Sequence, residues 1–83
     1  MIIRQTPIPR RKLSDDVQDR LVQLIQAEGL QPGDQLPSER ELMDTYHVGR
    51  PAVREALHNL RRMGLVEIRQ GERPRIATPS LGS

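Results

Sequence analysis

The chain has 83 residues, a formal net charge of +2 and no cysteine. A chain of this length forms one small domain that buries only about 60% of its unfolded surface, so a large enclosed active site is not expected. The lack of cysteine excludes disulfides and thiolate metal clusters, and no apolar run approaches the roughly 18 residues of a membrane helix.

The first twelve residues form a basic segment with two prolines and no helical periodicity. This segment carries a charge of +4, whereas residues 13–49 carry −6 and residues 50–83 carry +4. We expect residues 1–12 to be a disordered arm, which either stays solvated or contacts a polyanion such as DNA. Because these residues do not resemble a signal peptide, we expect a cytoplasmic protein without membrane contact.

A first helix is predicted from Ser14 to about Ala27, ending at Gly29. Ser14 can cap it, and Asp15 and Asp16 suit the positive end of the helix dipole. Apolar residues with helical spacing form one sector of this helix: Leu13, Val17, Leu21, Leu24 and Ile25. We interpret this helix as structural.

A turn and a second, short helix follow. In residues 31–34, Pro32 presets φ and Gly33 can take a positive φ, which places residues 35–36 in extended form before Pro37. A very short strand is plausible there. Residues 38–41 then form a capping box of the Ser-x-x-Glu type, which predicts a helix to about Tyr46.

A third helix is predicted from Arg50 or Pro51 to about Met63, after a turn at residues 47–49. Its apolar sector contains Val53, Ala56, Leu57, Leu60 and Met63, and its basic sector contains Arg50, Arg54, His58, Arg61 and Arg62. A solvated charged face is one interpretation. The alternative is a DNA-binding face, because the five-donor fork of arginine matches phosphates and guanine edges. The order of helix, short turn and helix is helix-turn-helix spacing, although helical hairpins without DNA function share it.

A β-hairpin is predicted at the end, with strands in residues 65–69 and 75–77 joined by a turn at residues 70–74. Gly71 permits close backbone approach, and Arg73 and Arg75 can follow phosphates. The alternative is a hairpin that merely closes the core. Residues 78–83 are interpreted as the start of a linker.

These elements together resemble the N-terminal winged-helix domain of GntR-family bacterial transcription regulators, over residues 13–77. The motifs are residues 32–34, 36–42, 53–57 and 64–66, and the form of residues 54–57 is typical of the FadR subgroup. The resemblance implies an α+β fold, mainly α: a winged helix-turn-helix with three helices and a two-stranded wing.

The resemblance also implies operator contacts from arginines of the second and third helices and from the wing. Family members often carry a Ser or Thr pair where this chain has Pro51 and Ala52, so a methyl group replaces hydroxyl contacts to phosphate. The candidate DNA-binding residues are Arg40, Gly49, Arg50, Pro51, Ala52, Arg54, Gln70, Gly71 and Arg73. We expect Arg50 and Arg54 to read guanines and Arg40 to brace the site from the preceding helix.

As partners, the resemblance implies double-stranded DNA, a second copy in a full-length homodimer, and a small-molecule effector held by a larger C-terminal domain that this chain lacks. It implies a metabolite-responsive regulator, with repression favoured. The main alternative is a winged-helix protein-interaction module without sequence-specific DNA binding. No enzyme activity and no cofactor are expected in this chain, since His47 and His58 lie eleven residues apart without a cysteine and phosphate-loop motifs are missing.

Overall fold

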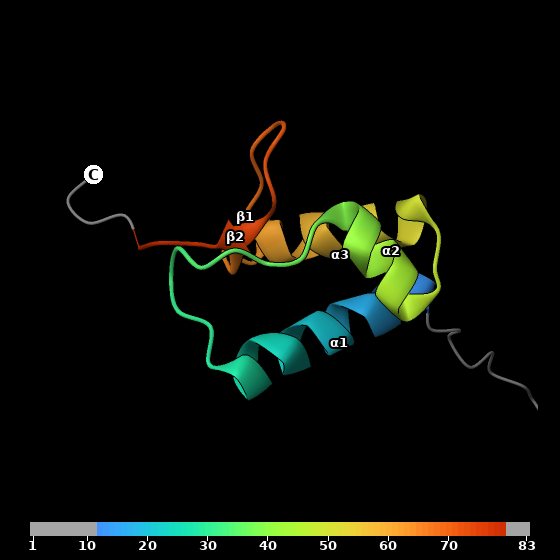
Figure 1. Ribbon diagram of the computed structural model, residues 1–83, viewed down its shortest axis with the longest axis horizontal. Helices are drawn as coiled ribbons and strands as arrows, with labels where there is room; N and C mark the ends of the chain where they lie inside the picture. The colour runs from blue at the N-terminus through green and yellow to red at the C-terminus, as the bar shows by residue number, and fades with distance from the viewer. Residues whose placement is uncertain (1–11, 80–83) are drawn as a thin grey trace, which may run out of the picture.

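The computed structural model describes residues 12–79, which form three helices followed by a two-stranded hairpin (Figure 1). The elements are α1 (Leu13–Glu28), α2 (Glu39–Tyr46), α3 (Arg50–Arg62), β1 (Val66–Glu67) and β2 (Arg75–Ile76). The predicted mainly helical winged fold is confirmed. The arm predicted at residues 1–12 and the linker predicted at 78–83 lie almost entirely outside the described residues.

The core lies mainly between α1 and α3, which pack along each other, and α2 closes one end (Figure 1). Its buried apolar side chains come from all three helices, the segment before α2 and β1: Val17, Leu21, Leu36, Leu42, Val53, Ala56, Leu57, Leu60 and Val66. This is the pattern that the helical spacing predicted for the middle of each helix.

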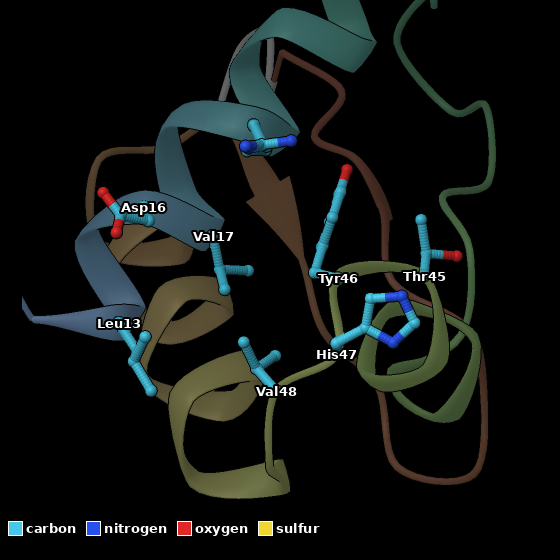
Figure 2. A pocket seen from close by; sticks show the side chains of 8 residues that line it. Leu13, Asp16, Val17, Thr45, Tyr46, His47 and Val48 are labelled. Atoms are coloured by element: carbon cyan, nitrogen blue, oxygen red, sulfur yellow. The ribbon is translucent and has the colours of Figure 1, made fainter.

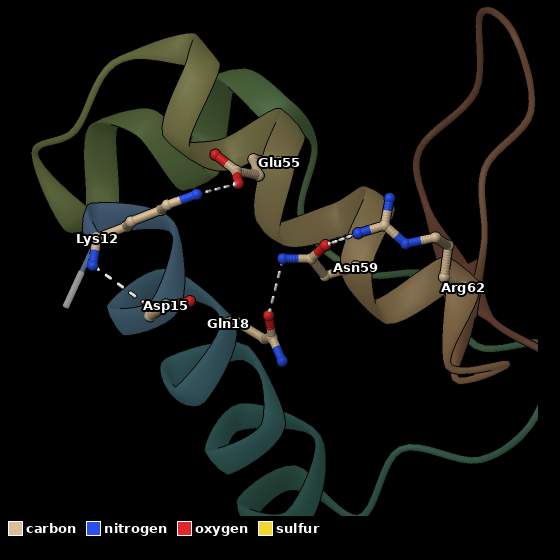
Figure 3. Close-up of polar contacts among 6 residues, drawn as sticks. All are labelled: Lys12, Asp15, Gln18, Glu55, Asn59 and Arg62. Carbon is tan, nitrogen blue, oxygen red and sulfur yellow. Dashed lines mark hydrogen bonds and ion pairs between the residues drawn. The ribbon is translucent and has the colours of Figure 1, made fainter. Parts of the chain in front are cut away.

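A polar network fastens α1 to α3 on the outside of this core (Figure 3). Asn59 donates from Nδ2 to Oε1 of Gln18 at 3.2 Å and accepts a hydrogen bond from Arg62. Lys12 Nζ lies 3.4 Å from a carboxylate oxygen of Glu55. Both contacts join residues more than 40 positions apart, so they link the two helices on the outside of the core.

The start of α1 differs from the prediction. The N-cap is Lys12, whose backbone N–H donates to the Asp15 carboxylate at 3.2 Å. Ser14 lies inside the helix with only 2% of its surface exposed, and its hydroxyl has no hydrogen-bond partner in the part of the chain described. The prediction that Ser14 caps the helix is therefore wrong, because the helix begins at Leu13 and the backbone N–H groups of Asp15 and Asp16 already donate to the Lys12 carbonyl.

Two residues assigned to apolar sectors are also not in the core. Leu13 is 60% exposed and Met63 is 59% exposed. Leu13 is the first residue of α1, and Met63 is the C-cap of α3, where the chain turns away at Gly64 with φ of +80°. Both residues lie at the ends of their helices, where the core side chains cover only part of them.

The start of α2 follows the prediction closely. The Glu41 backbone N–H donates to the Ser38 hydroxyl at 3.1 Å, and the Ser38 backbone N–H donates to the Glu41 carboxylate at 2.9 Å. The capping box is confirmed. At the other end His47 adopts a left-handed conformation, with φ of +55°, and starts the turn into α3.

The sheet is short and is extended by the segment before α2. Val66 pairs with Ile76 and Glu67 with Arg75 in antiparallel register, and Gln35 forms an isolated bridge with Arg75. The predicted strand at residues 65–69 is thus longer than the observed pair, because the hairpin beyond Glu67 leaves the helices and projects on the side of α3 opposite α1 (Figure 1). The bridge confirms the predicted extended segment at residues 35–36.

Candidate nucleic-acid interface

The first turn of α3 and the start of α2 meet at Glu39. One carboxylate oxygen of Glu39 lies 3.4 Å from Arg50 Nε, and the other accepts a hydrogen bond from Arg54 Nε at 3.0 Å. The capping box makes Glu39 the first residue of α2, and Arg50 and Arg54 are one turn apart on α3. The side chain of Glu39 is 33% exposed, against 55% and 61% for the two arginines, so the guanidinium groups remain open to solvent.

A groove lies between these residues and the hairpin, with a volume of about 370 Å³. Four of the predicted site residues line it, Arg40, Arg50, Gly71 and Arg73, although they come from three separate parts of the chain. A smaller hollow of about 310 Å³ adjoins it along α3, where Arg54 and His58 lie beside Glu39, Leu57 and Ile68. The fold therefore brings five of the predicted site residues to one surface, namely four arginines and Gly71.

Arg40 does not contact Arg50 or Arg54 in the structure. Its Nε lies 3.7 Å from Asp44 one turn along α2, and its side chain is 75% exposed. Glu39, which is not among the predicted site residues, contacts both Arg50 and Arg54 from α2. No local pattern in the sequence marks this role, because the contacts depend on how the turn between α2 and α3 places the two helices.

The remaining predicted residues of α3 surround its first turn. Gly49 is the N-cap, with φ of −82°. Any residue can adopt this φ value, so the backbone conformation does not require glycine at this position. Pro51 occupies the first turn as predicted, and it is exposed, whereas Ala52 is half-buried. Arg62, by contrast, is tied to Asn59 in the network that joins α1 (Figure 3).

An ion pair links the hairpin to α2 close to the tip. Gly71 has φ of +76°, and a Cβ added there would meet no atom within 4 Å, so the tip is open to an approaching molecule. Arg73 Nη1 lies 3.4 Å from the Glu41 carboxylate of α2. Gln70 is exposed beside Gly71. Arg75 is less available, because it lies in β2 and its side chain pairs with Glu72 at 3.3 Å.

Two carboxylates near the hairpin are held in their charged form. The pKa of Glu41 is lowered, first by the hydrogen bond from the Ser38 backbone and further by the charge of Arg73. The pKa of Glu67 is lowered mainly by the hydrogen bond from the Thr78 backbone. Both groups thus stay ionised while they hold the base of the hairpin and the start of α2.

A separate pocket of about 300 Å³ lies between the start of α1 and the turn after α2 (Figure 2). Leu13 and Val17 face Tyr46, His47 and Val48 across it, and burial raises the pKa of the Tyr46 hydroxyl. It shares no lining residue with the groove. Across residues 12–79 no three His, Cys, Asp or Glu side chains are grouped to hold a metal, and none of the helices could span a membrane.

The sequence of this chain is similar to bacterial regulatory proteins. The family model described as "Bacterial regulatory proteins, gntR family" matches residues 13–76. The chain is 54% identical over 78 residues to the HTH-type transcriptional repressor NanR of Enterobacter sp. (strain 638), and 53% identical to that of Salmonella newport. Each match covers 94% of this chain but 30% of the relative, so the chain spans less than a third of these proteins.

Solved structures agree with this likeness. The Streptococcus agalactiae GntR structure is 35% identical, with a TM-score of 0.71 over 78% of this chain and 32% of that one. The structure of AraR(DBD) in complex with operator ORX1 is 26% identical, with a TM-score of 0.76 over 90% of this chain and 93% of that one. The second match covers nearly the whole of both chains.

Proposed function

Because the chain belongs to the GntR family of bacterial regulatory proteins, we propose that it binds double-stranded DNA sequence-specifically, as the operator-reading domain of a transcription regulator. The observation that carries the proposal is the placement of Arg50 and Arg54 on the exposed first turns of α3, beside a groove flanked by the hairpin. The major groove of DNA admits an α-helix, and arginine side chains on such a helix can pair with guanine there. AraR(DBD), which has a similar fold and is known in complex with operator ORX1, supports the binding of operator DNA.

Within this proposal the nine predicted residues have separate roles. Arg50 and Arg54 read guanines, and the half-buried methyl of Ala52 meets a thymine methyl group. Arg40 and Arg73 contact phosphates on either side of the groove. Gly49 and Pro51 let the start of α3 approach the backbone closely, and Gln70 and Gly71 do the same for the wing at a minor groove.

The names of the longer relatives bear on how the domain is used in regulation. The relatives that this chain matches are named as repressors, which supports a role in repression, and we infer that two copies act together on a two-fold symmetric operator. A small-molecule effector held outside this domain would change the spacing of the two copies. A single domain should bind weakly, because it lacks the effective concentration that a second half-site provides.

The test is binding of this chain to a random-sequence duplex over a salt series, followed by selection of preferred sequences from the bound pool. We expect affinity to fall steeply with salt and a short motif to be enriched. Steep salt dependence without enrichment would overturn the sequence-reading role. Absence of binding at low salt would instead favour a protein-interaction module.

A further inference from the structure

The carboxylate of Glu39 is shared between the two arginines proposed to read bases. Its oxygens contact Nε of Arg50 at 3.4 Å and Nε of Arg54 at 3.0 Å. Both contacts are made through Nε, and both arginine side chains remain more than half exposed. The two guanidinium groups can thus bind a further acceptor without leaving Glu39.

Any further acceptor that binds either arginine lies close to the negatively charged carboxylate of Glu39. A phosphate group is an anion, so binding it next to the Glu39 carboxylate brings two like charges close together. The O6 and N7 atoms of guanine carry no formal charge, and the amino group of a neighbouring cytosine can even donate to a carboxylate. The same carboxylate therefore weakens phosphate binding and spares base reading.

The other acidic residues of α2 do not contact both Arg50 and Arg54. Asp44 lies 3.7 Å from Arg40 and Glu41 lies 3.4 Å from Arg73, so each of these acids contacts a single arginine, and neither contacts an arginine proposed to read bases. Glu39 is the acid shared by the two arginines on the exposed first turns of α3. It lies in the lining of both the groove and the adjoining hollow.

We propose that Glu39 is a specificity-determining residue, which keeps Arg50 and Arg54 from binding phosphates of non-operator DNA. The inference rests on the proposed function. Two like charges roughly 6 Å apart, partly screened by solvent and salt, change affinity by roughly tenfold. Glu39 lowers affinity for random sequence by about this factor and lowers operator affinity much less, which widens the ratio between them.

The test compares Glu39→Gln with wild type on two probes, a 20-base-pair random duplex and the duplex selected by the wild-type chain. Glutamine keeps the size and an acceptor oxygen but removes the charge. Glu39→Gln should bind the random duplex roughly tenfold more tightly, with a steeper salt dependence by about one phosphate contact, while the selected duplex gains much less. The matched control is Glu55→Gln, which changes the net charge by the same amount. Glu55 lies on α3 and pairs with Lys12 rather than with Arg50 or Arg54. Glu55→Gln should change both duplexes by the same small factor.

The outcomes separate this inference from the proposed function. If Glu39→Gln shifts both duplexes equally, as Glu55→Gln does, Glu39 acts only through net charge and the inference fails. If it weakens the selected duplex and leaves the random one unchanged, Glu39 positions the arginines without excluding phosphate, and the inference also fails. If wild type selects no motif, the proposed function fails first, and Glu39 then has no specificity to determine. Thermal melting of each variant shows whether the fold is retained.

Discussion

Arg73 in the hairpin lies 3.4 Å from the carboxylate of Glu41 on α2. The same oxygen of Glu41 accepts the backbone N–H of Ser38, which caps α2. One side chain therefore joins the helix start to the base of the wing. The two walls of the groove are thus linked by a contact within the domain.

The arginines of α3 and of the wing should differ in what they lose on substitution. Arg50→Ala or Arg54→Ala should cost about 1–3 kcal/mol on the selected duplex and relax base preference at one position. Arg73→Ala should weaken all sequences alike and reduce the salt slope by about one. Titrations on the selected duplex and on single-base variants of it measure both effects.

Arg62→Ala serves as the control for that series, because its partner is Asn59 rather than a residue of the groove. Equal losses on every sequence from Arg50, Arg54 and Arg73 would contradict base reading by α3.

Loss of the α2 cap should destabilise the domain. Ser38→Ala removes the hydroxyl that accepts the Glu41 N–H at 3.1 Å, and such caps contribute about 0.5–2 kcal/mol. Urea unfolding followed by circular dichroism should show this decrease in the free energy of unfolding. Ser38→Asp keeps a capping acceptor and should retain most of the stability, whereas equal losses from both variants would mean that the cap contributes little.

Ser14 should give the opposite result. Its hydroxyl is buried and lacks a partner among the described residues, and a buried unsatisfied polar group costs about 1–3 kcal/mol. Ser14→Ala should therefore leave stability unchanged or raise it, with an increase in melting temperature as the measurement. Ser14→Val tests the space around the hydroxyl. A clear loss of stability in the alanine variant would show that this hydroxyl does have a partner.

Acid should weaken the domain through Glu67. Its carboxylate accepts hydrogen bonds from the backbone N–H and the hydroxyl of Thr78, both at 3.2 Å, and its pKa is lowered in the folded state. The unfolded chain then binds more protons in mildly acidic solution, so this contribution is complete above the ordinary pKa near 4.5 and is lost as pH falls through the lower folded value.

Glu67→Gln should flatten the dependence of unfolding free energy on pH as the pH falls below about 4.5, relative to wild type. Thr78→Val keeps the backbone N–H, which is the main cause of the shift, and should retain most of the slope. Parallel slopes in wild type and Glu67→Gln would argue against this role.

Local signals in the sequence determined the elements and their order. The Ser-x-x-Glu box set the start of α2, Pro51 marked the first turn of α3, and glycines at positions 33, 64 and 71 took the positive φ values that turns require. Apolar spacing identified the core of each helix. These signals depend on residues three or four positions apart, so the sequence alone contains them. The family motifs extend over the same residues, and for that reason the winged fold and the family could be predicted.

Tertiary structure decided which side chains meet. The packing of α1 on α3 buried Ser14 and left Leu13 and Met63 exposed, although spacing suggested otherwise. The turn between α2 and α3 brought Glu39 between two arginines more than ten positions away, which no local pattern indicates. Such contacts depend on the relative position of whole helices, and that position follows from how their buried faces fit together rather than from any one stretch of sequence.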